Sequence, residues 1–458
     1  MPMSLGQKRA LAVGVLAIVI VGVGAGLWWM SIPRYPAYET PGAPAGVPFD
    51  RIIKIGILDP MTEIQGDGAW KGAWLAAYEI NSAGGIDVNG TTYYLGIIRE
   101  DTYEAEPALD ITKGVTAAQK IIVEDKAQYI IGGFRTESVK AYLEVVMDKK
   151  LLFIHTGAAT DYFCQVVIDQ YSRYKYCFRT MPINSTSLGG QIISELAYLR
   201  AYLSAVKNVS IHKWAILRED LDWAIPLANA LKAYLRYYGF DTAPVADIAY
   251  PITATSTDFA GYWSTIQSAG AQMVIPVISA QGGIYMMTQY NASTPGCVIV
   301  GIDVQSQLDT YWASSSGKCG YEIIMQAVDR TNKTSLTIPF WDAFKARFGH
   351  SPLYTAVGTY DAVKLLTDAI NKTQSFTNDK LVTQLETVNK GSPMTGISGQ
   401  LAFTRSHDVV AGYPYGYTLF CEWLSNGTKI TISSNALIYP NNLKTGNIQP
   451  PPWALNPA

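Results

Sequence analysis

Short apolar runs alternate with longer amphipathic segments from residue 52 to residue 279. The runs have the length of buried strands, and in the longer segments apolar residues recur three or four positions apart, as on one face of a helix. Strands are predicted over residues 52–60, 91–101, 127–133, 151–157, 213–220, 241–251 and 271–279, and helices over residues 68–85, 108–125, 138–150, 188–206, 223–239 and 258–270. Such alternation predicts parallel sheets with helices on both faces. Because the rhythm restarts after about residue 180, two successive α/β lobes are expected.

The segment YIIGGFRTESVKAYLEV, residues 129–145, joins one of these strands to a helix through Gly132 and Gly133. A strand, a tight glycine turn and a helix start leave free backbone N–H groups and the positive end of the helix dipole above the turn. Thr136 and Ser138 add hydroxyl groups at the same place. The junction therefore predicts an anion, which could be a phosphate, a reaction intermediate or the carboxylate of a small molecule.

The N-terminal segment has a different pattern. Lys8 and Arg9 precede 21 uncharged residues, ALAVGVLAIVIVGVGAGLWWM, and a Pro/Gly-rich linker follows over residues 32–49. A stretch of about 20 apolar residues suffices to cross a bilayer, and paired tryptophans at its far end suit the membrane interface. Residues 1–31 are therefore predicted to form a membrane anchor with the bulk of the chain outside. A cleaved secretory signal and a prepilin-like archaeal signal, with Arg9 and Ala10 before the apolar run from Leu11, are alternatives, and all three export the rest of the chain.

Composition narrows the setting further. The chain has 458 residues, a net charge of −2 and a charged fraction of 16%, which argues against a nucleic-acid or polybasic membrane-surface partner. Five cysteines without a CxxC pair argue against zinc and against thioredoxin-like redox chemistry. In an oxidising compartment, two loop disulfides are expected, Cys164–Cys177 and Cys297–Cys319. Sequons of the form N-x-S/T predict exposed, glycosylated positions at Asn89, Asn184, Asn208, Asn291, Asn332, Asn371 and Asn426.

The sequence patterns of common catalysts are missing. There is no GxxxxGK[ST] phosphate loop, no GxSxG elbow and no HExxH motif, and the four histidines are scattered singly. Asp59, Glu63 and Asp67 lie close together in one loop, where turn and cap carboxylates are a better interpretation than metal ligands. No metal and no cofactor are expected. Because neither a phosphate-loop lysine nor a nucleophile–base pair accompanies the turn, the anion expected there is a ligand carboxylate.

Several ordered segments resemble one family. IGILDPMT, GAWKGAWLAAYEINSAGGIDVNG, IIREDTYEAEPALD, YIIGGFRTESVKAYLEV, FIHTGAATD and YCFRTMPINSTSLGGQ occur in the order and spacing of type I periplasmic binding proteins, in the Leu/Ile/Val-binding (branched-chain amino acid) subgroup of ABC-transporter substrate-binding proteins. The resemblance covers about residues 52–430. It implies a Venus-flytrap fold, in which two doubly wound parallel-sheet lobes hold a ligand in the cleft between them.

The same resemblance implies how the chain is divided. Three crossovers between the lobes are expected near residues 179–182, 301–304 and 391–399. Lobe 1 would comprise residues 50–180 plus 304–393, lobe 2 residues 181–303 plus 394–432, and a C-terminal tail residues 433–458.

The resemblance also implies a pocket, with the ligand carboxylate at two turns of lobe 1 and the ammonium side at strand ends of lobe 2. The implied ligand-binding residues are Arg135, Thr136, Glu137, Ser138, Thr156, Ala158, Thr160, Asp222, Trp223, Ser279, Gln281 and Asp303. Trp223 stands where the family has tyrosine, and no acidic residue follows near Gln281, so Asp222 or Asp303 would have to receive an ammonium group. Arg135 and Glu137 are bulkier and more charged than the small residues usual at their positions, which argues against leucine itself.

These features predict an extracellular substrate-binding protein of an ABC importer, which captures an amino acid or a related small solute and delivers it to a membrane permease. It is expected not to be an enzyme and not to bind nucleic acid. Its expected place is the cell surface, anchored in the cytoplasmic membrane by the N-terminal helix, and low charge together with the sequons suggests an archaeal envelope glycoprotein. The alternative is an exported, filament-forming subunit that assembles through its apolar N-terminus and retains the ligand-binding fold.

Overall fold

A computed structural model describes residues 38–293, 296–432, 443–449 and 451–452. The predicted N-terminal membrane segment and most of the tail after residue 432 lie outside these ranges. Within the described part of the chain, no helix is both long enough and apolar enough to span a bilayer. Residues from Glu39 onward belong to one compact unit, which contains two large sheets.

Six strands form the first sheet, in the order β2-β3-β1-β4-β5-β6. They are β1 (Ile52–Asp59), β2 (Ile86–Val88), β3 (Thr91–Asp101), β4 (Tyr129–Gly132), β5 (Phe153–His155) and β6 (Cys177–Arg179). Apart from the antiparallel β2–β3 pair, neighbouring strands are parallel, and Ile55 of β1 stands opposite Ile97 of β3 and Tyr129 of β4. Every residue of β1 is buried, as expected for a parallel strand covered on both faces.

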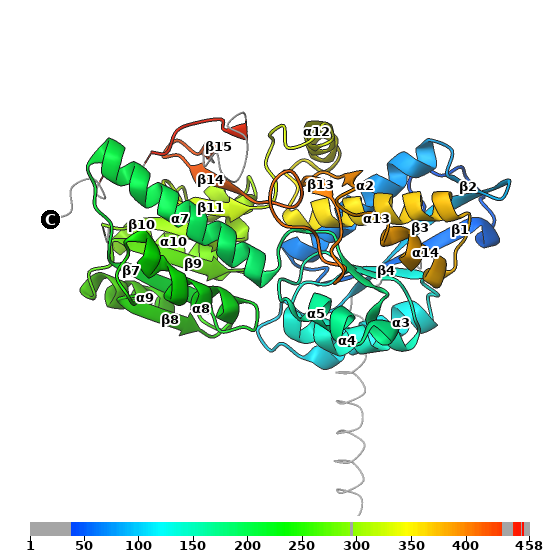
Figure 1. The fold of residues 1–458 in the computed structure, drawn as a ribbon, viewed down its shortest axis with the longest axis horizontal. Coiled ribbons are helices and arrows are strands. Elements are labelled where there is room, and N and C mark those ends of the chain that lie inside the picture. Colours follow the sequence, from blue (N-terminus) through cyan, green and yellow to red (C-terminus); the bar gives the residue numbers. More distant parts are fainter. Residues whose placement is uncertain (1–37, 294–295, 433–442, 450, 453–458) are drawn as a thin grey trace, which may run out of the picture. The chain divides into compact units, whose positions relative to one another are not determined.

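Helices cover both faces of this sheet (Figure 1). The helices α2 (Ile64–Ser82) and α13 (Tyr354–Thr373) pack together on one face, while α3 (Ile111–Val123), α4 (Thr136–Asp148) and α5 (Tyr162–Asp169) lie on the other. The remaining helices of this part are α6 (Tyr171–Tyr174), α12 (Thr337–Phe348) and α14 (Asn378–Leu385). A Cβ atom on Gly72 would lie 2.0 Å from the carbonyl oxygen of Ala356, so the close approach of α2 to α13 requires glycine at this position.

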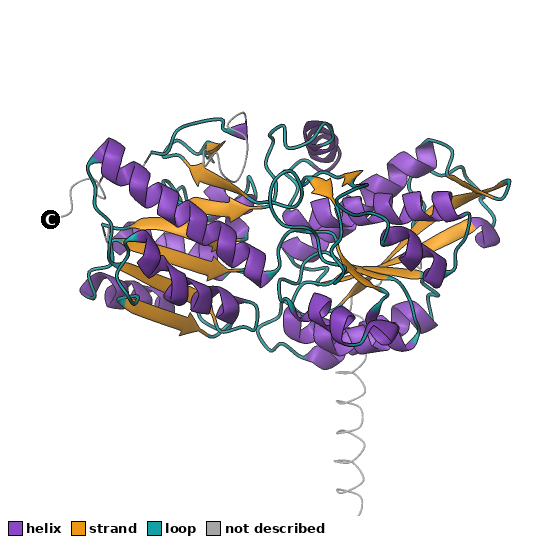
Figure 2. Cartoon of the chain, viewed as in Figure 1, coloured by secondary structure: helices purple, strands orange, loops and turns teal. Residues whose placement is uncertain are grey.

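Seven strands form the second sheet, in the order β15-β14-β11-β10-β9-β7-β8. They are β7 (Trp214–Glu219), β8 (Ala246–Tyr250), β9 (Met273–Ile278), β10 (Val298–Asp303), β11 (Ile323–Gln326), β14 (Leu419–Trp423) and β15 (Lys429–Thr431). On one face lie α7 (Ser185–Lys207) and α8 (Ala224–Tyr234), on the other α9 (Ser256–Ser268) and α10 (Gly282–Ser293), and α11 (Tyr311–Ser314) follows β10 (Figure 2). The predicted α/β architecture with largely parallel sheets is confirmed.

The chain passes between the sheets three times, and the second passage differs from the prediction. The first passage follows β6 and leads into α7. The sequence predicts the second near residues 301–304, but residues 304–326 stay with the second sheet, because β11 pairs with both β10 and β14. The predicted lobe boundary at residue 304 is therefore wrong. That boundary came from the family resemblance, and no strand was predicted after residue 279 that could have corrected it.

The third passage also lies later than residues 391–399. There, β12 (Met394–Thr395) and β13 (Gln400–Leu401) form a separate two-stranded sheet. The Ile397 N–H group still donates to Asp361 of α13, which belongs to the first sheet's helices. The chain then runs through residues 402–418 before β14 joins the second sheet.

All five cysteines are free, buried thiols, which contradicts the predicted disulfides Cys164–Cys177 and Cys297–Cys319. Cys297 and Cys319 pack within the hydrophobic core of the second sheet, in one cluster with Trp263. Burial raises the pKa of the Cys177 thiol to about 12, so this thiol stays protonated. These residues act as small apolar core side chains.

The sequon asparagines have different surroundings. Five of them are exposed, as glycosylation requires: Asn89, Asn208, Asn332, Asn371 and Asn426. Asn184 is half-buried, where its Nδ2 donates to Asp408 and its Oδ1 caps α7 by accepting from the Ser187 N–H group. The side chain of Asn291 lies outside the described part of the chain. Glycosylation of the five exposed asparagines stays a prediction.

Candidate functional site

The carboxyl ends of β1, β3 and β4 meet where the strand order reverses, which is where open α/β sheets bind ligands. The predicted glycine turn is present, with φ angles of 122° at Gly132 and 92° at Gly133. Its backbone donors are already used. The Gly133 N–H donates to Asp59 Oδ2 over 3.1 Å, and the Phe134 N–H donates to Glu104 Oε1 over 3.1 Å. The groups that this turn holds are carboxyl groups of the protein itself.

The two carboxyl groups below the turn are fully buried. Burial raises the pKa of Glu104 to about 7. Burial, with repulsion from Glu104 as the next cause, raises the pKa of Asp59 well above its ordinary value. Asp59 Oδ1 and Glu104 Oε2 have no hydrogen-bond partner among the described residues. The pair therefore retains protons near neutral pH, and the base of the turn carries little negative charge.

The hydroxyl-bearing residues that the two turns of lobe 1 were predicted to contribute lie outside the two cavities of the site. Ser138 is buried beside α3, where a Cβ atom on Gly114 would come within 2.4 Å of Ser138 Oγ. Thr136, Thr156 and Ala158 are also buried, and none of the four lines either cavity. The pattern of a helix start predicts which residues lie near the turn, but not the direction in which each side chain extends.

Phe134 and Arg135 are the members of this segment that reach the cavities, and Arg135 lines both of them. Its side chain extends from the residue before α4 and is 2% exposed. None of its three guanidinium nitrogens has a hydrogen-bond partner among the described residues. Its charge lowers the pKa of Glu63 and of Glu104, but in both cases the effect of burial is larger and the pKa is raised. A buried guanidinium without a partner is unfavourable until an anion binds it.

An apolar cavity lies between the two sheets. Its apolar wall includes Phe134, Ile183, Leu188, Ile302, Val304 and Met325. Trp223 contributes its ring, which is fixed by a 3.2 Å hydrogen bond from Nε1 to Glu219 Oε2. Tyr354 also lines the cavity, and its hydroxyl donates to the Gly157 carbonyl over 3.3 Å. The wall thus encloses an apolar volume beside the Arg135 guanidinium.

A second, more polar cavity shares Arg135 with the first. Glu63, Glu219 and Tyr250 are among its lining residues. Glu219 is buried and accepts three hydrogen bonds, from Ser279 Oγ over 2.6 Å, from the Ala280 N–H over 3.1 Å and from Trp223 Nε1. Its carboxylate is therefore committed to the protein.

In the second lobe, the structure brings three of the predicted residues to the cavities. Trp223 and Ser279 line the apolar cavity and Gln281 the polar one. Asp222 lies elsewhere: its carboxylate pairs with Lys140 Nζ over 2.7 Å, and its N–H donates to Glu137 Oε1 over 2.9 Å. Glu137 and Asp222 therefore join α4 to the segment before α8 and line neither cavity.

Asp303 is also outside the cavities. It is fully buried, accepting from the Tyr311 hydroxyl over 2.8 Å and from the Gln305 N–H over 3.0 Å. Burial raises its pKa to about 7. The sequence offers Asp222 and Asp303 as partners for a ligand ammonium, and the structure engages both in contacts within the protein.

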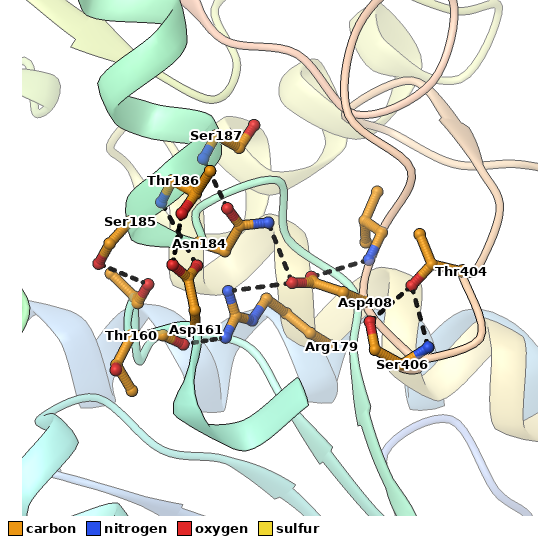
Figure 3. A network of polar contacts seen from close by, with 12 residues as sticks. Thr160, Asp161, Arg179, Asn184, Ser185, Thr186, Ser187, Thr404, Ser406 and Asp408 are labelled. Atoms are coloured by element: carbon orange, nitrogen blue, oxygen red, sulfur yellow. Dashed lines mark hydrogen bonds and ion pairs between the residues drawn. The ribbon is translucent and has the colours of Figure 1, made fainter. Parts of the chain in front are cut away.

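Thr160 belongs to a polar network around the first passage (Figure 3). Its carbonyl accepts from the fully buried Arg179, whose Nη1 lies 3.6 Å from Asp408 Oδ2. Asp408 also accepts from Asn184 Nδ2 over 3.0 Å, and Asp161 accepts from the Thr186 hydroxyl. The network holds the start of α7 against residues 404–408, so Thr160 supports the connection between the lobes and lines neither cavity.

Sequence reasoning missed several residues of the site. Glu219 and Gln326 are the last residues of β7 and β11, so the rule that ligands bind at strand carboxyl ends could have identified Glu219, whose strand was predicted. Gln326 had no such signal, because β11 was not recognised. Leu188, in the first turn of α7, reaches the apolar cavity only through the packing of the lobes.

Comparison with known proteins identifies a family and relatives of this chain. A family model described as periplasmic binding protein matches residues 52–413. A curated relative from Brucella melitensis biotype 1, Leu/Ile/Val-binding protein homolog 3, is 24% identical over 363 residues, which cover 78% of this chain and 88% of the relative.

Two solved structures are similar in fold. One is the branched-chain amino acid transporter substrate binding protein LivJ from Streptococcus pneumoniae, in complex with isoleucine. The comparison gives a TM-score of 0.66 and 18% sequence identity, and the matched region covers 82% of this chain and 97% of the LivJ chain. The other is a solute binding protein of an ABC transporter from Rhodopseudomonas palustris, in complex with 3,4-dihydroxybenzoic acid. The comparison gives a TM-score of 0.66 and 19% sequence identity, and the matched region covers 88% of this chain and 99% of the Rhodopseudomonas palustris chain.

Proposed function

This chain belongs to the periplasmic binding protein family, and we propose that it is the substrate-binding protein of an ABC importer. It captures a small carboxylate-bearing solute, an amino acid or a related compound, between its two sheets and delivers it to a membrane permease. The curated relative and the LivJ structure are named for branched-chain amino acids, and the Rhodopseudomonas palustris protein was solved with an aromatic acid. Those ligands support a small carboxylate as the solute class.

The observation that carries the proposal is the Arg135 guanidinium, buried at 2% exposure without a hydrogen-bond partner among the described residues. Such a group has the charge and geometry to bind a carboxylate through paired N–H donors. The cavity wall beside it comes from both sheets, and Gln65 Nε2 of α2 donates to the Ser279 carbonyl across them over 2.7 Å. A ligand seated there contacts both lobes and favours their closed arrangement.

The wider setting belongs to the same proposal. The basic residues before the apolar run over residues 10–30 support export of the lobes and anchoring at the outer face of the cytoplasmic membrane. The exposed sequon asparagines support glycosylation of an archaeal envelope protein. The filament alternative rests on the junction at Arg9 and Ala10, which lies outside the described residues. Intact mass of the purified protein distinguishes the routes, since prepilin-type processing removes about ten residues and a simple anchor keeps Met1.

Ligand capture is tested with purified protein in a thermal-shift screen of amino acids, other carboxylates and amides. We expect a carboxylate to raise the melting temperature and to bind with one-to-one stoichiometry in calorimetry. The ligand recovered after incubation should be chemically unchanged, as a binding protein without turnover requires. The proposal fails if neutral or cationic solutes bind and no carboxylate does, or if the bound solute is converted to a product.

A further inference from the structure

We infer that the ligand is an apolar or aromatic monocarboxylate without an α-ammonium group, bound through Arg135 with its body in the apolar cavity. This inference rests on the proposed function, because it specifies the solute that the same site selects. The ligand that we infer differs from an amino acid in one chemical group, the α-ammonium, and the effect of that group on binding can be tested separately.

The first argument is the charge of the wall. Of the described residues that line the apolar cavity, Arg135 is the one with a charged side chain, and no aspartate or glutamate is among them. A carboxylate bound to Arg135 neutralises that charge. An α-ammonium lies one carbon from the carboxylate, so it would enter the same wall without an acidic partner and with the guanidinium nearby. Like charges at this separation repel strongly where water is excluded.

The second argument concerns hydrogen bonding. Arg135 and the Gln326 Nε2 amide are both buried donors without a partner among the described residues, and they come from the first and the second sheet. The hydroxyls of Ser279 and Thr418 already donate to Glu219 and to Gln191. The wall therefore offers donors and needs acceptors. A carboxylate supplies acceptors, whereas an ammonium supplies three further donors.

The third argument is that the nearby acids are occupied. Asp222 pairs with Lys140, and Asp303 accepts from Tyr311 inside the core. Glu219 accepts hydrogen bonds from Ser279 and Trp223, which both line the cavity, and from the Ala280 N–H group, so it already accepts three. Glu63 belongs to the polar cavity and accepts from Gln281 over 3.4 Å. None of these four acids lines the apolar cavity, so none of them stands in its wall to receive an ammonium group.

The shape of the cavity favours a ring or a branched chain as the body of the ligand. Aromatic side chains come from both lobes, namely Phe134 and Tyr354 from the first and Trp223 from the second. Aliphatic side chains complete the lining, including Ile302 and Met325 of the second sheet. Apolar and aromatic walls of this kind bind a compact apolar group, while a few polar groups fix its orientation.

The test uses matched pairs that differ in the ammonium group alone: L-leucine against 4-methylpentanoate, and L-phenylalanine against 3-phenylpropanoate. Calorimetry and thermal shift, both on the full chain, give affinity and stabilisation. We expect the des-amino acid of at least one pair to bind more than about 10-fold tighter than its amino acid, which corresponds to about 1.4 kcal/mol. The neutral amide 3-phenylpropanamide and the cation 2-phenylethylamine should not bind.

Variants identify the residue responsible. Arg135→Met should weaken binding of 3-phenylpropanoate at least about 10-fold, since a charged hydrogen bond is lost, and Arg135→Lys should retain part of the affinity. The matched control is Arg405→Met, at an exposed arginine that lines neither cavity, and it should leave the affinity unchanged.

The outcomes separate this inference from the proposed function. If an amino acid binds tighter than its des-amino partner, the absence of an ammonium is refuted and solute capture stands. If Arg135→Met leaves carboxylate binding intact, the assignment of Arg135 is refuted. If no carboxylate of either kind binds while an amide or amine does, the proposed function fails as well.

Discussion

Two buried arginines should respond in opposite ways to the same substitution in the ligand-free protein. Arg135 is 2% exposed and its guanidinium has no hydrogen-bond partner among the described residues. Arg179 is 0% exposed, but it donates to the Thr160 carbonyl and pairs with Asp408. We therefore expect Arg135→Met to raise the free energy of unfolding and Arg179→Met to lower it.

The magnitudes follow from what each substitution leaves behind. A buried group without a partner costs about 1–3 kcal/mol, and nearby Glu104 and Glu63 offset part of that cost for Arg135. Arg135→Met should therefore stabilise the free protein by about 1–2 kcal/mol. Removing Arg179 leaves the Asp408 carboxylate without its buried partner, which costs about 3–5 kcal/mol.

Urea unfolding of both variants and of the wild type measures these differences, with an unchanged dependence on urea as the control for two-state comparison. A ligand at 100 times its dissociation constant should stabilise the wild type by about 2.7 kcal/mol and Arg135→Met by much less. Arg179→Met should retain the ligand-dependent gain wherever it folds. If Arg135→Met destabilises the free protein as strongly as Arg179→Met, then Arg135 has a structural partner, and the case for an open carboxylate receptor is refuted.

Three further predictions concern pH, the lobe contact and the cavity. Because burial raises the pKa of Glu104 to about 7 in the folded protein, the folded state holds a proton that the unfolded chain releases near pH 4.5, and the free energy of unfolding should fall as pH rises from about 5 to 7. Glu104→Gln should reduce this fall in the free energy of unfolding by up to about 3 kcal/mol, as measured by urea unfolding at several pH values. If the variant shows the same dependence on pH as the wild type, Glu104 does not have the raised pKa that causes it. Lys140→Ala removes an ion pair whose side chains are 34% and 47% exposed, so it should cost less than about 1 kcal/mol and change ligand affinity little; loss of binding would instead place Asp222 in the ligand site. Ala327→Trp fills the apolar cavity without touching a charge, and calorimetry should show loss of binding with Arg135 intact; retained affinity would mean that the ligand lies in the polar cavity.

Periodicity in the sequence predicted most of the architecture because the strands are apolar throughout and the helices are covered on one side. The resemblance to type I periplasmic binding proteins, drawn from segments between residues 52 and 430, is confirmed by the family model over residues 52–413. The strand pattern was followed only to residue 279, so β10 and β11 had no prediction, and the second passage, which was placed by the resemblance alone, was placed too early. The disulfide prediction failed because spacing in the chain does not show which thiols pack into a core.

The candidate site was predicted in its location but not in its chemistry. The glycine turn at residues 132–133 predicts backbone donors, and the Gly133 and Phe134 N–H groups do provide them. Which acids reach those donors depends on tertiary contacts, since Asp59 and Glu104 lie 74 and 30 residues from the groups that they accept from. No local pattern in the sequence links residues so far apart. For the same reason, the sequence could list Asp222 and Asp303 as free acids, although both have partners in the folded chain.

Occupation of the turn by the protein's own carboxyl groups moves anion recognition from the backbone to one side chain. Backbone N–H groups would bind any carboxylate at a fixed place in the first lobe. The unpartnered donors instead stand on both lobes, at Arg135 beside the first sheet and at Gln326 on the second. A ligand that satisfies both donors can do so only when the two sheets are held at their present separation, because the cavity wall is shared between them. Ligand binding and lobe closure are then favoured by the same contacts, and the donors left open in the free protein are the source of that coupling.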